Sequence, residues 1–307
     1  MKRIEILGLQ TIGEIKCGDN LPNIIIEAVN REACGIQEKD ILVLTSKVIS
    51  KAMGLTKKKK DIKVGKKALA VSRRTGKDPV WVQMIMDEGH EVIAVVPLAG
   101  GFRDHVLDAS ECAETSTDLC ENEQCVFVTM SPTGAIHTCD AGIDGSNHPE
   151  GLVSFMAPDC DEAAEAVREE IKAATGKEVA VILADTEIMP VGTMDFAVGS
   201  SGIEPRSKEF GKVDNFNKPK FGGMDLTAHE LAAASALVFG QVNAGIPVAV
   251  IRGFNYAVSD IENIANTFRP KGTREDARRM IKEIVTATAN AKDLKQRLLL
   301  KTAARFI

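Results

Sequence analysis

The sequence predicts an α+β fold in which mixed sheets are packed against helices. Apolar runs rich in β-branched residues and amphipathic or alanine-rich runs follow one another without the regular strand–helix–strand alternation of a doubly wound sheet. Neither G-x-G-x-x-G nor G-x-x-x-x-G-K-[ST] occurs, so neither a Rossmann dinucleotide site nor a P-loop is supported. The chain has 307 residues, 44% of them hydrophobic, which is enough for one large domain or two medium ones.

The first half of the chain is predicted to mix strands and helices irregularly. The helix that begins near Asp78 has a proline at its start and Val80, Met84 and Ile85 near helical spacing. A polar stretch at 99–123 separates two β-branched runs and is interpreted as an inserted loop. In chain order we expect a strand at 4–12, a helix at 21–34, a strand that turns polar at 40–54, a helix at 78–91, and strands at 91–97 and 124–130.

The second half is predicted to contain a buried strand that ends in a carboxylate. An amphipathic helix stopped by Gly176 precedes this strand, and the strand runs into Asp185. Asp225 is expected to cap the N-terminus of a later alanine-rich helix. The elements expected here are a helix at 161–175, a strand at 178–187, a helix at 224–243, a strand at 246–253 and a helical C-terminus at 273–307.

Composition excludes several classes of protein. Charged residues make up 26% and the formal net charge is −5, so no global basic field would attract nucleic acid. One Trp and one Tyr are too few for a surface that stacks bases. No apolar run is long enough for a membrane span and no secretory leader is present, so we expect a cytoplasmic protein. The seven cysteines form no C-x-x-C pair, which favours free thiols over a zinc site at Cys112, Cys120 and Cys125.

Two acidic segments indicate a metal site. The loop "DAGIDGSNHPEG" (140–151) is rich in oxygen and glycine and contains Asp144, and Asp185 stands at the polar end of a buried strand with Thr186 after it. Ligand-binding groups often lie at the carboxyl ends of strands. Two carboxylates, a hydroxyl and backbone carbonyls make a hard site that suits Mg²⁺ or Mn²⁺ completed by phosphate oxygens. The alternative is a simple turn at Asp144 and a capping role for Asp185.

Three further segments carry groups that suit a phosphate ligand. "TSKVISKAMG" (45–54) places hydroxyls and ammonium groups after a strand, and the alternative is a solvated strand end. Gly240 and Gly245 bracket a short loop that contains Gln241, and the alternative is a helix C-cap followed by a tight turn. The lysine-rich run at 57–67 is interpreted as a solvated loop, or as a surface that attracts a polyanionic substrate.

Taken together and in this order, several segments resemble the coenzyme F(420)-0:L-glutamate ligase family, also called gamma-glutamyl ligases. The segments are "IKCGDNL", "LVLTSKVISKAMG", "TGKDPVWVQMIMDE", "DAGIDGSN", "VILADTE", "FAVGSSGI" and "FGQVNAGIPVAVIRG", spread over most of 4–253. The resemblance implies an intertwined α+β homodimer that uses GTP (or ATP), Mg²⁺ or Mn²⁺, and L-glutamate. It also implies a catalytic domain at 1–255 and a C-terminal helical extension at 256–307.

The resemblance carries roles to individual residues. Asp144 and Asp185 would be the catalytic carboxylates that share a first metal ion, and Thr186 and Gln241 would hold a second. The nucleotide-binding residues that it implies are Ile12, Gly13, Glu14, Ile15, Ser46, Lys47, Lys51, Asn147, Gly240, Gln241 and Gly245. The implied reaction activates an acceptor carboxylate as an acyl phosphate, which the amine of glutamate then attacks. The catalytic base is not identified, and Glu187 and His148 are the adjacent candidates.

One segment departs from the family pattern. After Asp185 and Thr186 the family reads close to G-R-P-W-R-R-G, whereas this chain reads "EIMPVGTMDFAVG", without arginine. Those arginines are suited to an anionic acceptor, so their absence leaves the acceptor open. The acceptor is the deazaflavin precursor or another acid, such as a pterin or folate tail. Basic residues downstream are possible replacements, namely Arg206, Lys208, Lys212, Lys218 and Lys220. From another class, the chain would be a nucleotide-binding regulatory protein without catalysis.

Overall fold

The computed structural model describes residues 2–98, 125–132, 135–189, 192–268 and 274–303. It divides into two compact units, Met1–Thr267 and Phe268–Ile307. Within the described residues, no helix is both long enough and apolar enough to cross a membrane. The insertion predicted at 99–123 lies outside these residues, and the assignment of a catalytic domain to 1–255 stays a prediction.

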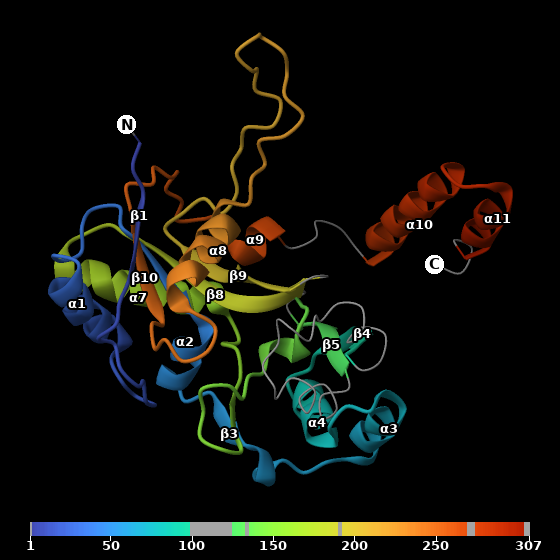
Figure 1. Cartoon of the computed structure of the whole chain (residues 1–307), viewed down its shortest axis with the longest axis horizontal. Coiled ribbons are helices and arrows are strands. Elements are labelled where there is room, and N and C mark those ends of the chain that lie inside the picture. Colours follow the sequence, from blue (N-terminus) through green and yellow to red (C-terminus); the bar gives the residue numbers. More distant parts are fainter. Residues whose placement is uncertain (1, 99–124, 133–134, 190–191, 269–273, 304–307) are drawn as a thin grey trace, which may run out of the picture. The chain divides into compact units, whose positions relative to one another are not determined.

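A five-stranded mixed sheet forms the centre of the first unit (Figure 1). Its strands, in the order in which they neighbour one another, are β1 (Glu5–Gly8), β10 (Val248–Arg252), β2 (Ile41–Thr45), β8 (Ala180–Met189) and β9 (Gly192–Ser201). Strands β2 and β8 run parallel, and the other neighbours are antiparallel. The α+β fold with a mixed sheet is therefore confirmed.

Helices cover both faces of this sheet because its central strands are apolar on both sides. Leu42 and Leu44 of β2 lie in one core with α1 (Leu21–Glu32) and α7 (Cys160–Thr175). Ile41 and Val43 point to the opposite face, since side chains alternate along a strand. Helix α8 (Thr227–Phe239) contacts all five strands. The four β2 residues Ile41, Leu42, Val43 and Leu44 are completely buried.

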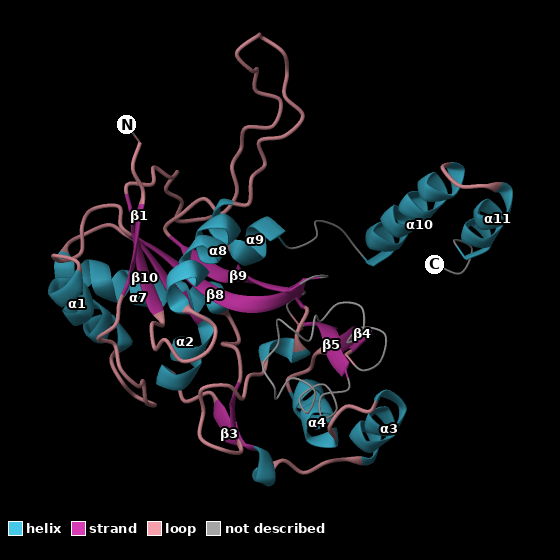
Figure 2. Ribbon diagram, viewed as in Figure 1, coloured by secondary structure: helices cyan, strands magenta, loops and turns pink. Residues whose placement is uncertain are grey.

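A smaller lobe with its own core belongs to the same unit (Figure 2). Trp81, Ile85, Phe127, Val153 and Phe155 are buried in that second core. Its elements are β3 (Thr56–Lys58), the 3₁₀ turn η1 (Lys59–Asp61), α3 (Lys66–Thr75), α4 (Pro79–Asp87), β4 (Glu91–Pro97), β5 (Cys125–Met130), β6 (Ile136–His137), η2 (Asp140–Gly142) and β7 (Leu152–Ser154). Strand β3 pairs with β7, and β4, β5 and β6 form a three-stranded sheet.

The predicted helix start at Asp78 and the predicted helix end at Gly176 are confirmed. Asp78 accepts a hydrogen bond from the Val80 N–H at the start of α4, and Gly176 ends α7 with a left-handed φ of 68°. The expectation for Asp225 is wrong. Helix α8 begins after Leu226, without a side-chain cap, and the backbone N–H of Asp225 donates instead to Ser207 Oγ at 2.8 Å.

Several elements differ from the sequence predictions. The polar half of 40–54 is the short helix α2 (Ser46–Ala52), which follows β2 without a break. The lysine-rich run is not a plain loop, because it contains β3, η1 and the start of α3. Residues 205–226 project from the first unit as a long arm (Figure 1). A bridge between Val213 and Pro219 joins its two sides.

The first unit ends near α9 (Ile264–Phe268). The second unit consists of α10 (Arg274–Asn290) and α11 (Leu294–Ala303), so the predicted C-terminal helix is two helices. The Arg297 guanidinium donates to the carbonyls of Ala289, Asn290 and Lys292. These bonds satisfy carbonyl groups where α10 ends and the chain reverses.

Candidate active site

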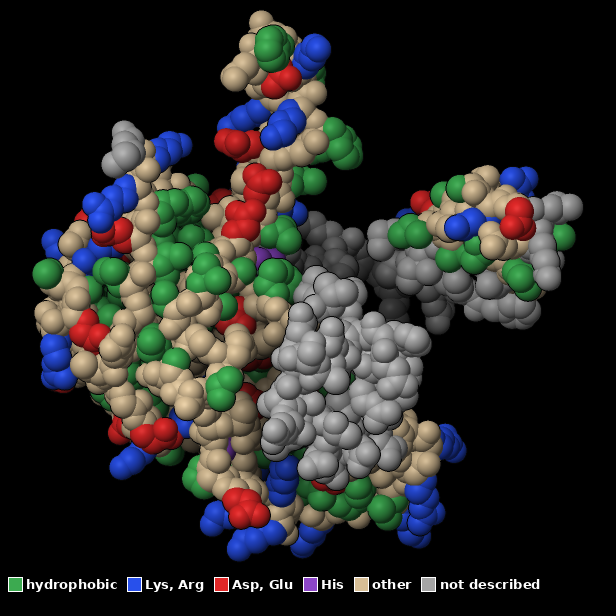
Figure 3. All heavy atoms as spheres, in the orientation of Figure 1, with side chains coloured by type: hydrophobic (Ala, Val, Ile, Leu, Met, Phe, Trp, Pro, Cys, Tyr) green, Lys and Arg blue, Asp and Glu red, His purple; other side chains and the backbone are tan. Residues whose placement is uncertain are grey.

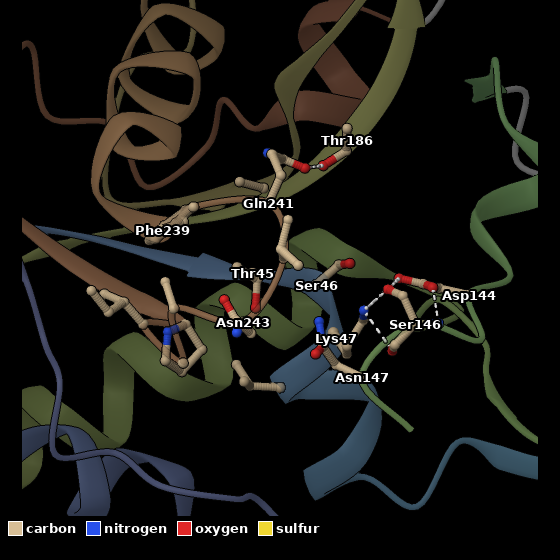
Figure 4. Close-up of a pocket in the computed structure, with 18 of the residues that line it drawn as sticks. Thr45, Ser46, Lys47, Asp144, Ser146, Asn147, Thr186, Phe239, Gln241 and Asn243 are labelled. Carbon is tan, nitrogen blue, oxygen red and sulfur yellow. Dashed lines mark hydrogen bonds and ion pairs between the residues drawn. The ribbon is translucent and has the colours of Figure 1, made fainter. Parts of the chain in front are cut away.

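A cavity of about 330 Å³ opens where β2 and β8 end (Figure 4). Its walls come from α2, the loop around Asp144 and the turn after α8. All the predicted site residues except Ile12 line it, namely Gly13, Glu14, Ile15, Ser46, Lys47, Lys51, Asp144, Asn147, Asp185, Thr186, Gly240, Gln241 and Gly245. Ile12 is instead part of the main core, 6% exposed. Segments far apart in the chain therefore meet in one place.

Parallel pairing of β2 and β8 places Ser46 beside Asp185. Thr45 and Ala184 are register partners, so the residues that follow them leave the sheet at the same end. Ser46 Oγ donates to Asp185 Oδ1 at 2.7 Å. Burial raises the pKa of Asp185 to about 7, and the carboxylates of Glu187 and Asp144 act in the same direction, against the Ser46 hydrogen bond.

Asp144 lies in a different electrostatic environment. Lys47 Nζ is 2.6 Å from Asp144 Oδ2 and also donates to Ser146 Oγ at 2.6 Å. The Ser146 N–H donates to Asp144 Oδ1 at 2.6 Å. Burial alone would raise the pKa of Asp144, but Lys47 and Ser146 together lower it. The two carboxylates are therefore held in opposite ways, one by a cation and the other by a hydroxyl.

A second group of oxygen atoms surrounds Thr186. Thr186 Oγ1 donates to Asp195 Oδ1 at 2.7 Å and lies 3.4 Å from Gln241 Oε1. Thr186 and Asp195 are cross-strand partners on β8 and β9. Since adjacent strand residues point to opposite faces, Thr186 and Asp185 serve two separate oxygen groups. Asp195 was missed in the sequence analysis, although a hairpin over 186–196 would have paired it with Thr186.

Basic and glycine residues complete the cavity. Lys51 Nζ forms an ion pair with Glu14 Oε1 at 2.5 Å and donates to the Asn147 carbonyl at 3.0 Å. Gly240 and Gly245 both have left-handed φ angles, 66° and 68°. Few residues other than glycine adopt such angles, so the turn after α8 depends on both.

The two candidate bases do not line the cavity. His148 Nε2 lies 2.9 Å from Ser154 Oγ, and burial together with Lys51 and Lys47 lowers its pKa. Glu187 accepts hydrogen bonds from the backbone and hydroxyl of Thr138, the first at 2.6 Å. Both side chains are thus engaged outside the cavity.

The oxygen donors fit one or two hard divalent cations. No cluster of three or more His, Cys, Asp or Glu side chains suited to a metal occurs in the described part of the chain. The donor set is instead mixed, with Asp144 and Asp185 on one side and Thr186, Gln241 and Asp195 on the other. Among the described side chains, none forms an ion pair with Asp185. A cation there would compensate a buried carboxylate.

Comparison with known proteins gives the family. A family model described as F420-0:Gamma-glutamyl ligase matches residues 10–253. The chain belongs to this family. The coenzyme F420:L-glutamate ligase of Methanosarcina acetivorans is 31% identical over 272 residues, which are 88% of this chain and 93% of that protein. The ligase of the same name from Methanothermobacter thermautotrophicus is 32% identical over 253 residues, 82% of this chain and 89% of that protein.

Family membership confirms the resemblance inferred from the motifs. It supports an enzyme of gamma-glutamyl ligase type that forms a C–N bond with glutamate. The segment that departs from the family pattern lies at the end of β8 and the start of β9, beside Thr186. The downstream basic residues do not line the cavity, and Lys208 and Lys212 pair with glutamates of their own region.

Proposed function

We propose that this protein is a GTP- or ATP-dependent ligase that joins an acceptor acid to L-glutamate. The single observation that supports this most is the meeting of Lys47 and Lys51 with the Asp144–Asp185 pair in one cavity. A triphosphate carries the negative charge that two ammonium groups attract, and its metal ions need the hard oxygen ligands that lie beside them.

In the proposed reaction, the acceptor carboxylate attacks the γ-phosphorus and the nucleoside diphosphate leaves. The glutamate amine then attacks the acyl carbon, phosphate leaves, and one proton is lost from the amine. Lys47 and Lys51 would bind phosphate oxygens, while Asp144 and Asp185 would hold one cation and Thr186 and Gln241 a second. When bound, such cations neutralise charge that develops on the phosphate oxygens.

The acceptor we propose first is the deazaflavin precursor named by the family, coenzyme F420-0. The absence of arginine after Thr186 favours a second candidate, a different acid such as a pterin or folate tail. Both acceptors use the same nucleotide and metal residues, so only the acceptor pocket would differ.

A ligation assay tests the proposal. The full chain is incubated with labelled glutamate, GTP or ATP, Mn²⁺ and a panel of deazaflavin, pteroate and folate acceptors, and products are identified by mass spectrometry. We expect a glutamyl adduct and phosphate release only when acceptor and glutamate are both present. The Asp185→Asn variant should give no adduct and release no phosphate. Nucleotide binding without turnover on any acceptor would favour a regulatory protein instead.

We further propose that the active form is a homodimer. The arm carries exposed aromatic rings, with Phe216 and Phe221 81% and 94% exposed. Acidic and basic side chains surround its hydrophobic ones (Figure 3). Val242, which lines the cavity, is 76% exposed, so a partner molecule could cover the site. Light scattering on the full chain should give the mass of a dimer. The double variant Phe216→Ser, Phe221→Ser should give a lower mass. A monomer at assay concentration would refute this proposal.

A further inference from the structure

The loop that carries Asp144 starts from an unusual backbone turn. Asp140, Ala141 and Gly142 have φ angles of 48°, 62° and 68°, so three consecutive residues are left-handed and two of them are not glycine. Residues with a β-carbon adopt this conformation only where their surroundings enforce it. Ile143 and then Asp144 follow directly, so this turn leads the chain into the loop that carries the Asp144 carboxylate.

A buried ion pair holds the turn in place. Lys77 is 2% exposed, and its Nζ lies 2.6 Å from Asp140 Oδ2 and donates to the Cys125 carbonyl at 3.1 Å. The other carboxylate oxygen of Asp140, Oδ1, accepts a hydrogen bond from the Phe127 N–H at 2.9 Å. The pair thus connects the turn to the start of β5 and to the segment between α3 and α4.

The far side of the turn lies against the second carboxylate. A β-carbon at Gly142 would be 3.7 Å from Asp185 Oδ2 and 2.5 Å from Met156 Cε, so this side of the turn packs against both residues. On the other side, Asp144 exchanges both backbone hydrogen bonds with Ser154, at 3.1 and 2.8 Å. The turn therefore lies between Asp185 and the strand contact of Asp144.

We propose that Lys77 and Asp140 are positioning residues that set the separation of Asp144 and Asp185, and with it the divalent-cation affinity of that pair. This inference rests on the proposed function, because it assumes that the two carboxylates hold a metal ion. Neither Lys77 nor Asp140 lines the cavity. An ion pair suits this task because its geometry is directional, whereas apolar packing would tolerate sliding of the turn.

A second buried ion pair provides a matched control. Arg252 Nε lies 2.9 Å from Asp40 Oδ1, and Asp40 is 2% exposed. Asp40 precedes β2 and Arg252 ends β10, so this pair lies at the end of the sheet opposite to the cavity. Breaking it should cost stability without changing the metal site.

The experiment is a Mn²⁺ titration, followed by electron paramagnetic resonance, of the full chain and its variants well below their melting temperatures. Lys77→Met and Asp140→Asn should each weaken Mn²⁺ binding at least about tenfold, as supporting residues of metal sites do. Lys77→Arg should recover part of the affinity. Arg252→Met should lower the melting temperature and leave the Mn²⁺ Kd within twofold. Lys77→Met keeps both Lys47 and Lys51, so GTP affinity in EDTA should change much less than Mn²⁺ affinity does.

The outcomes separate the two proposals. If the parent chain binds no Mn²⁺, with or without GTP, both the metal site and its positioning pair are refuted. If the parent binds Mn²⁺ and both Lys77→Met and Asp140→Asn bind it within twofold, the positioning proposal alone is overturned. If Arg252→Met weakens Mn²⁺ binding as much as they do, the effect is general destabilisation and the positioning proposal also fails. Asp140→Asn retains an acceptor for the Phe127 N–H, so it keeps the test decisive if Lys77→Met does not fold.

Discussion

Replacing Asp144 by asparagine should change nucleotide affinity in opposite directions with and without metal. Lys47 is paired with Asp144 at 2.6 Å, and this pairing competes with a phosphate group for the lysine. Asp144→Asn removes the charge but keeps the size of the side chain. Without metal, Lys47 then becomes available to the triphosphate, so binding should tighten. With metal, the loss of a carboxylate ligand should weaken binding.

The structure sets the size of both effects. The Lys47 and Asp144 side chains are 19% and 40% exposed, so solvent screens the pair and its contribution is about 1 kcal/mol at most. Releasing Lys47 therefore lowers the nucleotide Kd by up to about fivefold. Loss of a ligand carboxylate should raise the Kd at least about tenfold in Mn²⁺, because even supporting residues of metal sites cost that much.

Isothermal titration with GTP, once in EDTA and once in excess Mn²⁺, measures both effects. Glu14→Gln is the matched control, since it frees Lys51 from its ion pair at 2.5 Å without touching a proposed metal ligand. It should tighten nucleotide binding slightly in both conditions. A shift of the same sign in EDTA and in Mn²⁺ for Asp144→Asn would refute the exchange of partners at Lys47.

Three other predictions concern stability, the second oxygen group and the thiols. Arg252→Met leaves Asp40 buried without its guanidinium partner, so the free energy of unfolding in urea should fall by about 3–5 kcal/mol, and a loss below about 1 kcal/mol would contradict this. Asp195→Asn should lower kcat in the ligation assay with little change in unfolding; unchanged turnover would remove Asp195 from the site. Burial raises the pKa of Cys160 to about 12, so at pH 8 its thiol stays protonated and iodoacetamide should label the exposed Cys17 first. Equal labelling in peptide mass spectrometry would contradict this order.

The sequence predicted those parts of the fold that depend on local pattern. The apolar run at 178–187 corresponds to β8, and the amphipathic run at 161–175 corresponds to α7. Both could be predicted because hydrophobic periodicity is visible in the order of neighbouring residues. The cavity could also be predicted, because the acidic and basic segments follow strands whose ends meet once the sheet forms. Helix α2 was missed because it directly continues the strand β2 and has no side-chain cap at its start.

Contacts between distant segments were not predictable in the same way. Lys77 lies 63 residues from Asp140, and nothing in the local sequence distinguishes its ammonium group from those of the surface lysines nearby. Asp195 reads as one polar residue in an apolar strand until its register with Thr186 is known. Asp225 has the residue type of a cap but bonds to Ser207, which illustrates how tertiary contacts override local preference.

The two carboxylates of the proposed first metal site adjoin different hydrophobic cores. Asp185 continues a strand whose Val181 and Leu183 pack in the main core, whereas Asp144 follows Ile143 of the smaller one. A cation bound to both would act as a cross-link between the main sheet and the smaller lobe of the first unit, comparable to a disulfide between two chain segments. Substitutions inside either core would then change the separation of the two carboxylates by shifting the sheet or the lobe, while every side chain at the site stayed the same.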